Sequence, residues 1–308
     1  MDTVRVVEMI LPVVLALVIG AICGNKKIFN RDEVAAIKKF AVNISLTAVV
    51  FMAFATAEYR LNTILIPIMM YLVCLLAWYM GKVIVKYSPG TTVYLPYLLS
   101  GFEAGMLGYT LYSILYGADI SAFATVDLGQ VLFVFTFYKI QISRSFAKDR
   151  KLNLRKEIFT SPIIIGILLG IIVGTTGLYH ALVNAQVNAI FDQTVDFIAA
   201  PTSALILFSI GYDLSDGKIY WGKAIKFALL RLALMTVLLF AVLGIYSLIF
   251  EPNLAIKRAF ILMFLMPTPF VLPIFANDPV EQSTIASVLS ISTLISLLGF
   301  VVLAISGI

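Results

Sequence analysis

The stretch Phe264-Leu-Met-Pro-Thr-Pro-Phe-Val-Leu-Pro273 places three prolines inside an apolar segment, 259–276, that is long enough to cross most of a bilayer. Each proline removes a backbone donor, and its ring clashes with the carbonyl four residues earlier. Backbone left unpaired at membrane depth survives only where it is buried in protein or lines a wet cavity. The stretch therefore predicts a discontinuous crossing whose free backbone groups line a site; the alternative is a kinked structural helix.

The composition predicts a polytopic protein of the lipid bilayer. Hydrophobic residues make up 61% of the 308 residues and charged residues 13%, against about 45–50% and 25% in soluble domains. The mean hydropathy is +1.01. Cys23 and Cys74 lie in apolar runs without metal spacing, and His180 has no neighbouring Cys or His, so we expect neither a metal nor a cofactor.

About 20 apolar residues are needed for each membrane span, and the chain contains ten such segments. They are approximately 5–24, 38–57, 62–85, 93–115, 121–141, 160–179, 190–211, 224–249, 257–276 and 282–306. With this count, the 22 lysines and arginines fall on one side of the membrane, except Arg5, Arg60, Lys257 and Arg258. Basic loops face the cytoplasm. We therefore expect a protein of the cell (inner) membrane with both termini outside, and the basic residues need no nucleic-acid partner.

The chain also shows signs of an internal repeat. Pro12, Gly20 and Gly24 recur as Pro162, Gly170 and Gly174 at an offset of 150 residues. Five spans in each half would make the second half inverted relative to the first, an architecture found in many secondary transporters. We predict a first five-helix repeat over 1–141, a basic cytoplasmic linker over 142–159 and a second five-helix repeat over 160–308.

The repeat gives the proline-rich ninth span a partner in the fourth span, Gly101-Phe-Glu-Ala-Gly-Met-Leu-Gly-Tyr-Thr110. This partner has glycines at 101, 105 and 108 and a carboxylate, Glu103. Glycine lowers the cost of unwinding and allows close backbone approach. Two weak points at corresponding positions predict that spans four and nine break and cross near the membrane midplane, where a solute binds.

Five short strings, in order, resemble the auxin efflux carrier family of membrane transporters over nearly the whole chain. Lys39-Phe-Ala-Val-Asn-Ile-Ser-Leu-Thr47 resembles that family's KFVFNLALP, and Glu103-Ala-Gly-Met-Leu-Gly-Tyr-Thr110 resembles its NTGFLGLP. The other three are similar to its seventh-span, ninth-span and tenth-span patterns: Ala200-Pro201 with Leu205-Ile-Leu-Phe-Ser-Ile-Gly211, Met266-Pro-Thr-Pro269, and Ser287-Val-Leu-Ser-Ile-Ser-Thr-Leu294.

The resemblance implies a secondary transporter of a small organic anion, such as auxin or a dicarboxylate, and not an enzyme. It also implies that the broken fourth and ninth spans hold the solute, with an asparagine on its carboxylate, and it is compatible with a homodimer. This chain departs from the family in having Glu103 in place of that asparagine. It also has Thr47 and Thr110 in place of prolines, which indicates less rigid breaks in the first half.

The carboxylates that we place deepest are Glu103 and Asp127. Intramembrane carboxylates are costly and indicate function by default; each could carry a proton, or bind Na⁺ when charged. The alternative is a carboxyl group satisfied by neighbours such as Tyr109 or Gln130. We expect Arg231 to extend to the cytoplasmic surface. The predicted solute contacts are Asn43, Glu103, Gly105, Gly108, Pro267, Thr268 and Pro269, and the predicted coupling residues are Glu103 and Asp127.

Alternating-access transport of a carboxylate by this site is the leading hypothesis, with Glu103 protonated when the solute is bound. A cation/proton antiporter or symporter of the Na⁺/H⁺ type is the alternative, with Glu103 and Asp127 as its ion ligands. A channel is disfavoured because no filter-like repeat appears. An intramembrane enzyme is disfavoured because no Ser–His pair is formed.

Overall fold

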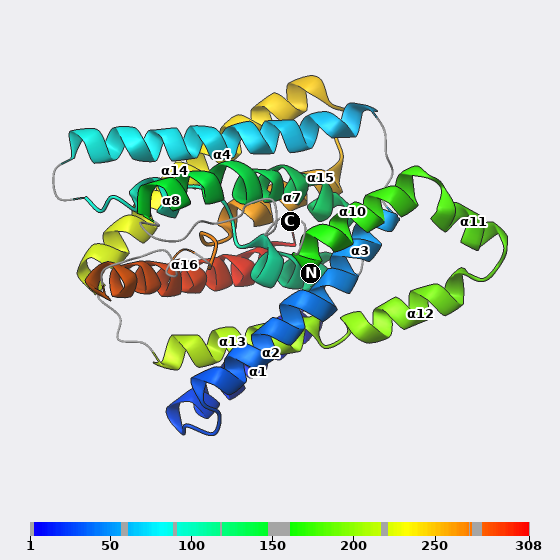
Figure 1. Cartoon of the computed structure of the whole chain (residues 1–308), viewed down its shortest axis with the longest axis horizontal. Coiled ribbons are helices and arrows are strands. Elements are labelled where there is room, and N and C mark those ends of the chain that lie inside the picture. Colours follow the sequence, from blue (N-terminus) through cyan, green and yellow to red (C-terminus); the bar gives the residue numbers. More distant parts are fainter. Residues whose placement is uncertain are drawn as a thin grey trace.

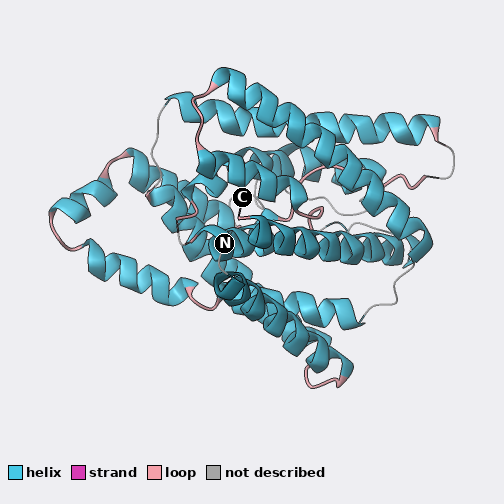
Figure 2. Ribbon diagram, turned by 180° about the vertical axis from the view of Figure 1, so that it is seen from behind, coloured by secondary structure: helices cyan, strands magenta, loops and turns pink. Residues whose placement is uncertain are grey.

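The computed structural model describes residues 3–56, 61–88, 91–117, 119–146, 161–216, 221–270, 272 and 279–307. Within these ranges every regular element is a helix and no strand is present (Figures 1 and 2). The predicted all-α class is therefore confirmed. The predicted linker, 142–159, and the third proline of the opening stretch, Pro273, fall wholly or mostly outside the described residues.

The first half of the chain contains both α-helices and π-helical turns, the latter labelled η. The elements are α1 (Thr3–Asn25), α2 (Arg31–Phe40), η1 (Ala41–Ser45), α3 (Leu46–Ala55), α4 (Leu61–Tyr87), α5 (Leu95–Leu98), η2 (Ala104–Gly108), α6 (Tyr109–Tyr116), α7 (Ser121–Phe133), η3 (Val134–Tyr138) and α8 (Lys139–Phe146). The second half contains α10 (Pro162–Thr175), α11 (Leu178–Asn184), α12 (Asn188–Ala199), α13 (Thr202–Asp216), α14 (Trp221–Ile249), α15 (Leu254–Leu265) and α16 (Pro279–Ser306).

Polar capping residues set the starts of two helices that lead to the site. The Asn30 side chain accepts a hydrogen bond from Glu33 N at 2.9 Å, and Glu33 Oε2 accepts one from Asn30 N at 2.8 Å. This reciprocal capping box begins α2. Asn253 accepts a hydrogen bond from Ile256 N at 3.2 Å and begins α15. Both caps satisfy N–H groups that have no partner within the helix.

Six stretches are long and apolar enough to cross a membrane: Arg31–Ala55, Ile64–Tyr87, Ser121–Ile142, Asn188–Tyr212, Trp221–Ile249 and Ser283–Ser306. A seventh results if α10 and α11, which are bent by 59°, form one span. The chain is therefore a membrane protein with several spans. Ten spans are not confirmed: the stretch of α1 that the structure describes in full, Leu11–Asn25, is shorter than these six, and the predicted spans 93–115 and 257–276 are broken.

The helices pack into two groups (Figure 1). In the first helix group, α1 packs along α13, and α3 packs along α10 and α12. In the second helix group, α4 packs along α7, α14 packs along α16, and both α15 and α6 pack against α7. The two groups meet where α3 contacts α7, α13 contacts η2 and α1 contacts α16. The broken segments that follow α5 and α15 belong to the second group.

Glycines bring the helices of the first group into backbone contact. A Cβ atom on Gly20 would lie 2.0 Å from Phe208 O of α13, and Gly211 meets the α1 backbone at a similar distance. On the other side, a Cβ atom on Gly170 would lie 2.5 Å from Phe51 O of α3. Small residues of this kind let helices approach closely in lipid, where packing replaces the hydrophobic driving force.

Replacing Gly20 by alanine should therefore force α1 away from α13 and destabilise the protein by about 1–3 kcal/mol, as overpacking does elsewhere. Gly244→Ala in α14 is the matched control, because nothing lies within 4 Å of a Cβ atom there. The control should be neutral or stabilising by up to about 1 kcal/mol. Thermal unfolding of the detergent-purified variants measures both effects, and equal unfolding temperatures would contradict the close contact.

Candidate functional site

The first part of the site is the break that the prolines predict. α15 ends at Leu265, and Met266 leaves the helix with an extended backbone, φ −67° and ψ 148°. A residue before proline avoids the helical region because of the proline ring, and Pro267 follows Met266 directly. Pro267, Thr268 and Pro269 continue outside any α-helix. The ninth predicted span is therefore discontinuous at these residues, and the kinked-helix alternative is wrong.

The second part of the site is the glycine-containing segment that follows α5. The helix ends at Leu98, and the chain resumes a helical path only at Ala104. Gly101 has φ +70°, a conformation that side-chain-bearing residues rarely adopt. A Cβ atom on Gly101 would also lie 3.1 Å from Pro269 Cγ. Glycine is thus required here both for the backbone conformation and for the approach of the second break.

The two breaks cross and are joined by hydrogen bonds between segments more than 160 residues apart. Glu103 N donates to Pro267 O at 2.8 Å. In return, Phe270 N donates to the Glu103 carboxylate at 2.6 Å. Thr268 Oγ1 donates to Tyr97 O at 2.9 Å. The structure therefore brings together four predicted site residues, Glu103, Pro267, Thr268 and Pro269.

Arg231 lies at the crossing, and the expectation that its side chain extends to the cytoplasmic surface is wrong. It is 3% exposed and does not reach the surface. Its guanidinium donates to three carbonyl oxygens at the ends of the broken helices: Leu98 (2.8 Å), Gly101 (2.7 Å) and Met266 (3.1 Å). It also lies 5.4 Å from the Phe102 ring centroid. Carbonyls at a helix end lack intrahelical donors and favour a cation, so Arg231 satisfies both breaks at once.

Asp127 is buried in a hydrogen-bonded chain beside the crossing. Tyr109 Oη donates to Asp127 Oδ2 at 2.9 Å, and Gln130 Nε2 donates to Asp127 Oδ1 at 3.0 Å. Gln130 Oε1 accepts a hydrogen bond from Phe102 N at 3.4 Å. The neighbours named from the sequence, Tyr109 and Gln130, therefore do satisfy this carboxylate. The chain connects Asp127 to the residue next to Glu103.

Three predicted contacts come from elements around the crossing. A Cβ atom on Gly105 would lie 3.6 Å from Leu46 Cδ2 of the first helix group and 3.8 Å from Glu103 Oε1. Gly108 packs against Phe123, whose ring leaves no room for a side chain there. Asn43 lies half-buried in the π-helical turn η1, and its side chain forms no hydrogen bond within the described residues. Leu46, and not Asn43, is the residue of this helix next to Gly105.

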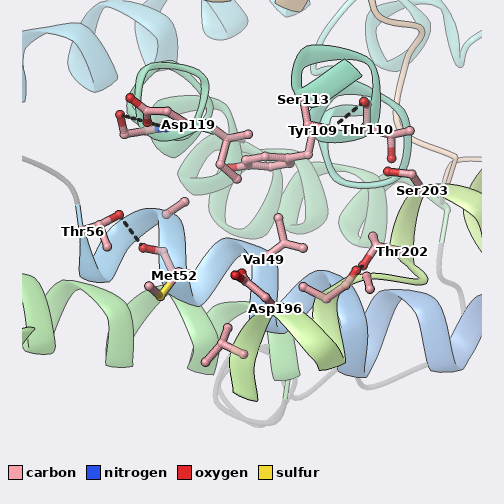
Figure 3. Close-up of a pocket in the computed structure, with 16 residues that line it drawn as sticks. Val49, Met52, Thr56, Tyr109, Thr110, Ser113, Asp119, Asp196, Thr202 and Ser203 are labelled. Carbon is pink, nitrogen blue, oxygen red and sulfur yellow. Dashed lines mark hydrogen bonds between the residues drawn. The ribbon is translucent and has the colours of Figure 1, made fainter. Parts of the chain in front are cut away.

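A cavity of about 260 Å³ lies between the two helix groups. Val49, Met52 and Thr56 of the first group line one side, and Tyr109, Thr110 and Ser113 of the second group line the other (Figure 3). Asp119 and Asp196 line it from opposite groups, and its described lining residues include no Lys, Arg or His. Tyr109 therefore connects this cavity to Asp127. The sequence analysis predicted neither Asp119 nor Asp196 as a site residue.

No cluster of three or more His, Cys, Asp or Glu side chains suited to a metal ion occurs in the part of the chain that the structure describes. The groups at the crossing are backbone amides and carbonyls, the buried guanidinium of Arg231 and the carboxylates of Glu103 and Asp127. Such a site can bind and release a solute or an ion.

Comparison with known proteins agrees with this class of site. A family model described as membrane transport protein matches residues 144–304, just over half of the chain. The "Uncharacterized transporter YfdV" of Escherichia coli K12 is 21% identical over 252 residues, covering 76% of each chain. The Shigella flexneri protein of the same name matches equally. The protein is a membrane transporter and not an enzyme. The chain belongs to the membrane transport protein family, that of the auxin efflux carriers.

Arg231→Gln should destabilise the protein by about 3–5 kcal/mol, the usual effect of breaking a buried charged network. The reason is that carbonyl groups at both breaks lose their donor. Arg231→Lys should recover part of the loss, since an ammonium cannot reproduce the planar fork of donors. Lys226→Gln, an exposed position on the same helix, is the control. Thermal unfolding in detergent measures all three, and an Arg231→Gln protein as stable as the control would refute the role of Arg231.

Proposed function

We propose that the protein is a secondary transporter of a small organic anion, a carboxylate, and that it works by alternating access with a proton carried on Glu103. The observation that carries this proposal is the crossing of two unwound segments at which the Glu103 carboxylate accepts the Phe270 amide hydrogen. Free backbone donors at a break suit an anionic group. The proposed solute contacts are Glu103, Gly105, Gly108, Pro267, Thr268 and Pro269, with Asn43 approaching from the first helix group.

The packing of the helices supports an inverted repeat of five plus five spans, with the halves at 1–141 and 160–308. In the repeat, α1 corresponds to α10 and α3 corresponds to α13. The contact of α1 with α13 then has its counterpart in the contact of α10 with α3. Likewise, α4 packs on α7 as α14 packs on α16. Gly20 and Gly170, which are repeat partners, each meet a carbonyl oxygen of the helix opposite.

Alternating access follows from the same arrangement. The crossing belongs to the second helix group, and the 260 Å³ cavity opens between this group and the first. Displacement of one group relative to the other would move the crossing with its hydrogen bonds intact. In the orientation that the basic loops favour, both termini lie outside the cell membrane. A homodimer stays a prediction from the family resemblance.

A second candidate function is transport of a cation, Na⁺ or H⁺, in the manner of a cation/proton antiporter or symporter. The cavity favours it, because Asp119 and Asp196 line the space and its described lining carries no basic side chain. Negative charge in the lining of a cavity attracts cations and repels anions. Glu103 and Asp127 would then serve as the ion ligands deeper in the protein.

Thermal unfolding in the presence of different solutes distinguishes the two candidates. A solute that binds the folded protein raises its stability in proportion to the logarithm of its concentration over Kd. Relative to choline chloride, we expect succinate or acetate, added as choline salts, to raise the unfolding temperature, and sodium chloride to have no effect. The opposite pattern would favour cation transport and refute the anion proposal.

Glu103→Gln should uncouple transport from protons, since glutamine cannot take up the proton that the glutamate carries. In proteoliposomes, succinate uptake by the native protein should increase with an inwardly directed proton gradient. Uptake by Glu103→Gln should be independent of that gradient. Glu251→Gln, an exposed carboxylate after α14, should behave like the native protein. Uptake by Glu103→Gln that still follows the imposed pH gradient would contradict the role of Glu103.

A further inference from the structure

We propose that the Glu103 side chain is an internal competitor, which occupies the amide that an anionic substrate needs and which leaves that amide when it is protonated. This inference rests on the proposed function and adds to it a specificity-determining role for one residue. This role replaces the direct solute contact proposed for Glu103 above, so that Glu103 is neither a fixed substrate ligand nor a simple source of repulsion. Its carboxylate stands where the carboxylate of the solute will lie.

Backbone donors are scarce in the second break. Pro267 and Pro269 carry no N–H group, so between Met266 and Val271 only Thr268 and Phe270 offer one. The Met266 N–H is used within its own helix end, where it donates to Met263 O at 3.0 Å. The Phe270 N–H donates to Glu103 Oε2 at 2.6 Å. An incoming anion therefore meets a break in which the amide that follows the second proline is already taken.

The competitor is held in place by its own backbone. Glu103 N donates to Pro267 O at 2.8 Å, and this bond joins the two breaks directly. Gly101 packs against Pro269 and fixes the approach of the two segments. A ligand attached to the protein acts at a high effective concentration, so an ionised Glu103 competes well with a free carboxylate. The backbone bond does not depend on the carboxylate, and the side chain can therefore leave while the crossing stays intact.

Protonation decides which carboxylate holds the amide. A charged acceptor forms a stronger hydrogen bond than a neutral one, so protonated Glu103 gives up Phe270 N–H more readily to a solute. The titratable or charged groups that face this region are Asp127 on α7, Tyr138 on η3 and Arg231 on α14. One proton on Glu103 and one carboxylate from the solute leave the net charge of the buried site unchanged. Loading is thus electroneutral for a monocarboxylate.

Calorimetric titration of the purified, full-length protein with acetate and with succinate, at an acidic and an alkaline pH, tests this inference. We expect the native protein to bind the probe more weakly at alkaline pH. Glu103→Ala, which frees the amide, should bind equally at both pH values. At alkaline pH it should bind about tenfold or more tighter than the native protein, as expected for loss of a charge-assisted competitor.

Glu103→Gln is the second test variant, for use if Glu103→Ala does not fold. Its amide oxygen can still accept the hydrogen bond from Phe270 N–H, so the contact between the two breaks is kept. It should bind independently of pH, with an affinity between those of the native protein and Glu103→Ala. Glu251→Gln is the control for removal of a carboxylate elsewhere and should match the native protein.

Three results would overturn the inference. If the native protein and both Glu103 variants bind with equal affinity and equal pH dependence, Glu103 does not compete with the solute; this result would refute the inference but not the proposed carboxylate transport. Binding by the native protein that both variants lose would make Glu103 a direct substrate ligand. The absence of probe binding in every variant at both pH values would overturn the carboxylate proposal together with the inference.

Discussion

Backbone groups that leave a helix within a bilayer find no water, and each must be satisfied by the protein. In this chain two helices break at the same place, and the resulting free groups largely satisfy one another. Arg231 donates hydrogen bonds to carbonyl oxygens of both breaks, and the Glu103 amide donates to Pro267 O. The Glu103 carboxylate accepts a hydrogen bond from the Phe270 amide. The remaining features of the second helix group serve to hold these partners together.

This mutual satisfaction explains why the crossing can be part of a moving body. Three segments of the chain, from α5–η2, α14 and the region after α15, are joined through Arg231 and Glu103 within the second helix group. The first helix group is closed on itself by glycine contacts between α1, α13, α3 and α10. The two groups share fewer helix contacts, and a cavity lies between them. Each helix group is held together more tightly than it is held to the other group, so the two groups could move relative to each other as alternating access requires.

The breaks could be predicted from the sequence because proline and glycine act locally: Pro267 and Pro269 remove donors, and Gly101 supplies a positive φ. Glu103 could be placed at the crossing because it lies between Gly101 and Gly105 in the sequence. Arg231 was misplaced, because its distance from the start of its segment indicated an interfacial residue. In α14 it lies about 15 Å from the helix start, about half of the hydrocarbon thickness. Asp119 and Asp196 could not be found, since their shared cavity exists only after distant helices pack.

The π-helical turn Ala41–Ser45 has a consequence for the helix that follows it. A turn of this kind holds one residue more than a regular turn, which advances everything beyond it by about 100° around the axis. That angular phase determines that Leu46 faces Gly105 and that Val49, Met52 and Ala53 face the cavity. The number of residues in this turn therefore fixes the orientation of α3 about its axis. Loss of a single residue between 41 and 45 would leave the composition almost unchanged but would rotate Val49, Met52 and Ala53 away from the cavity.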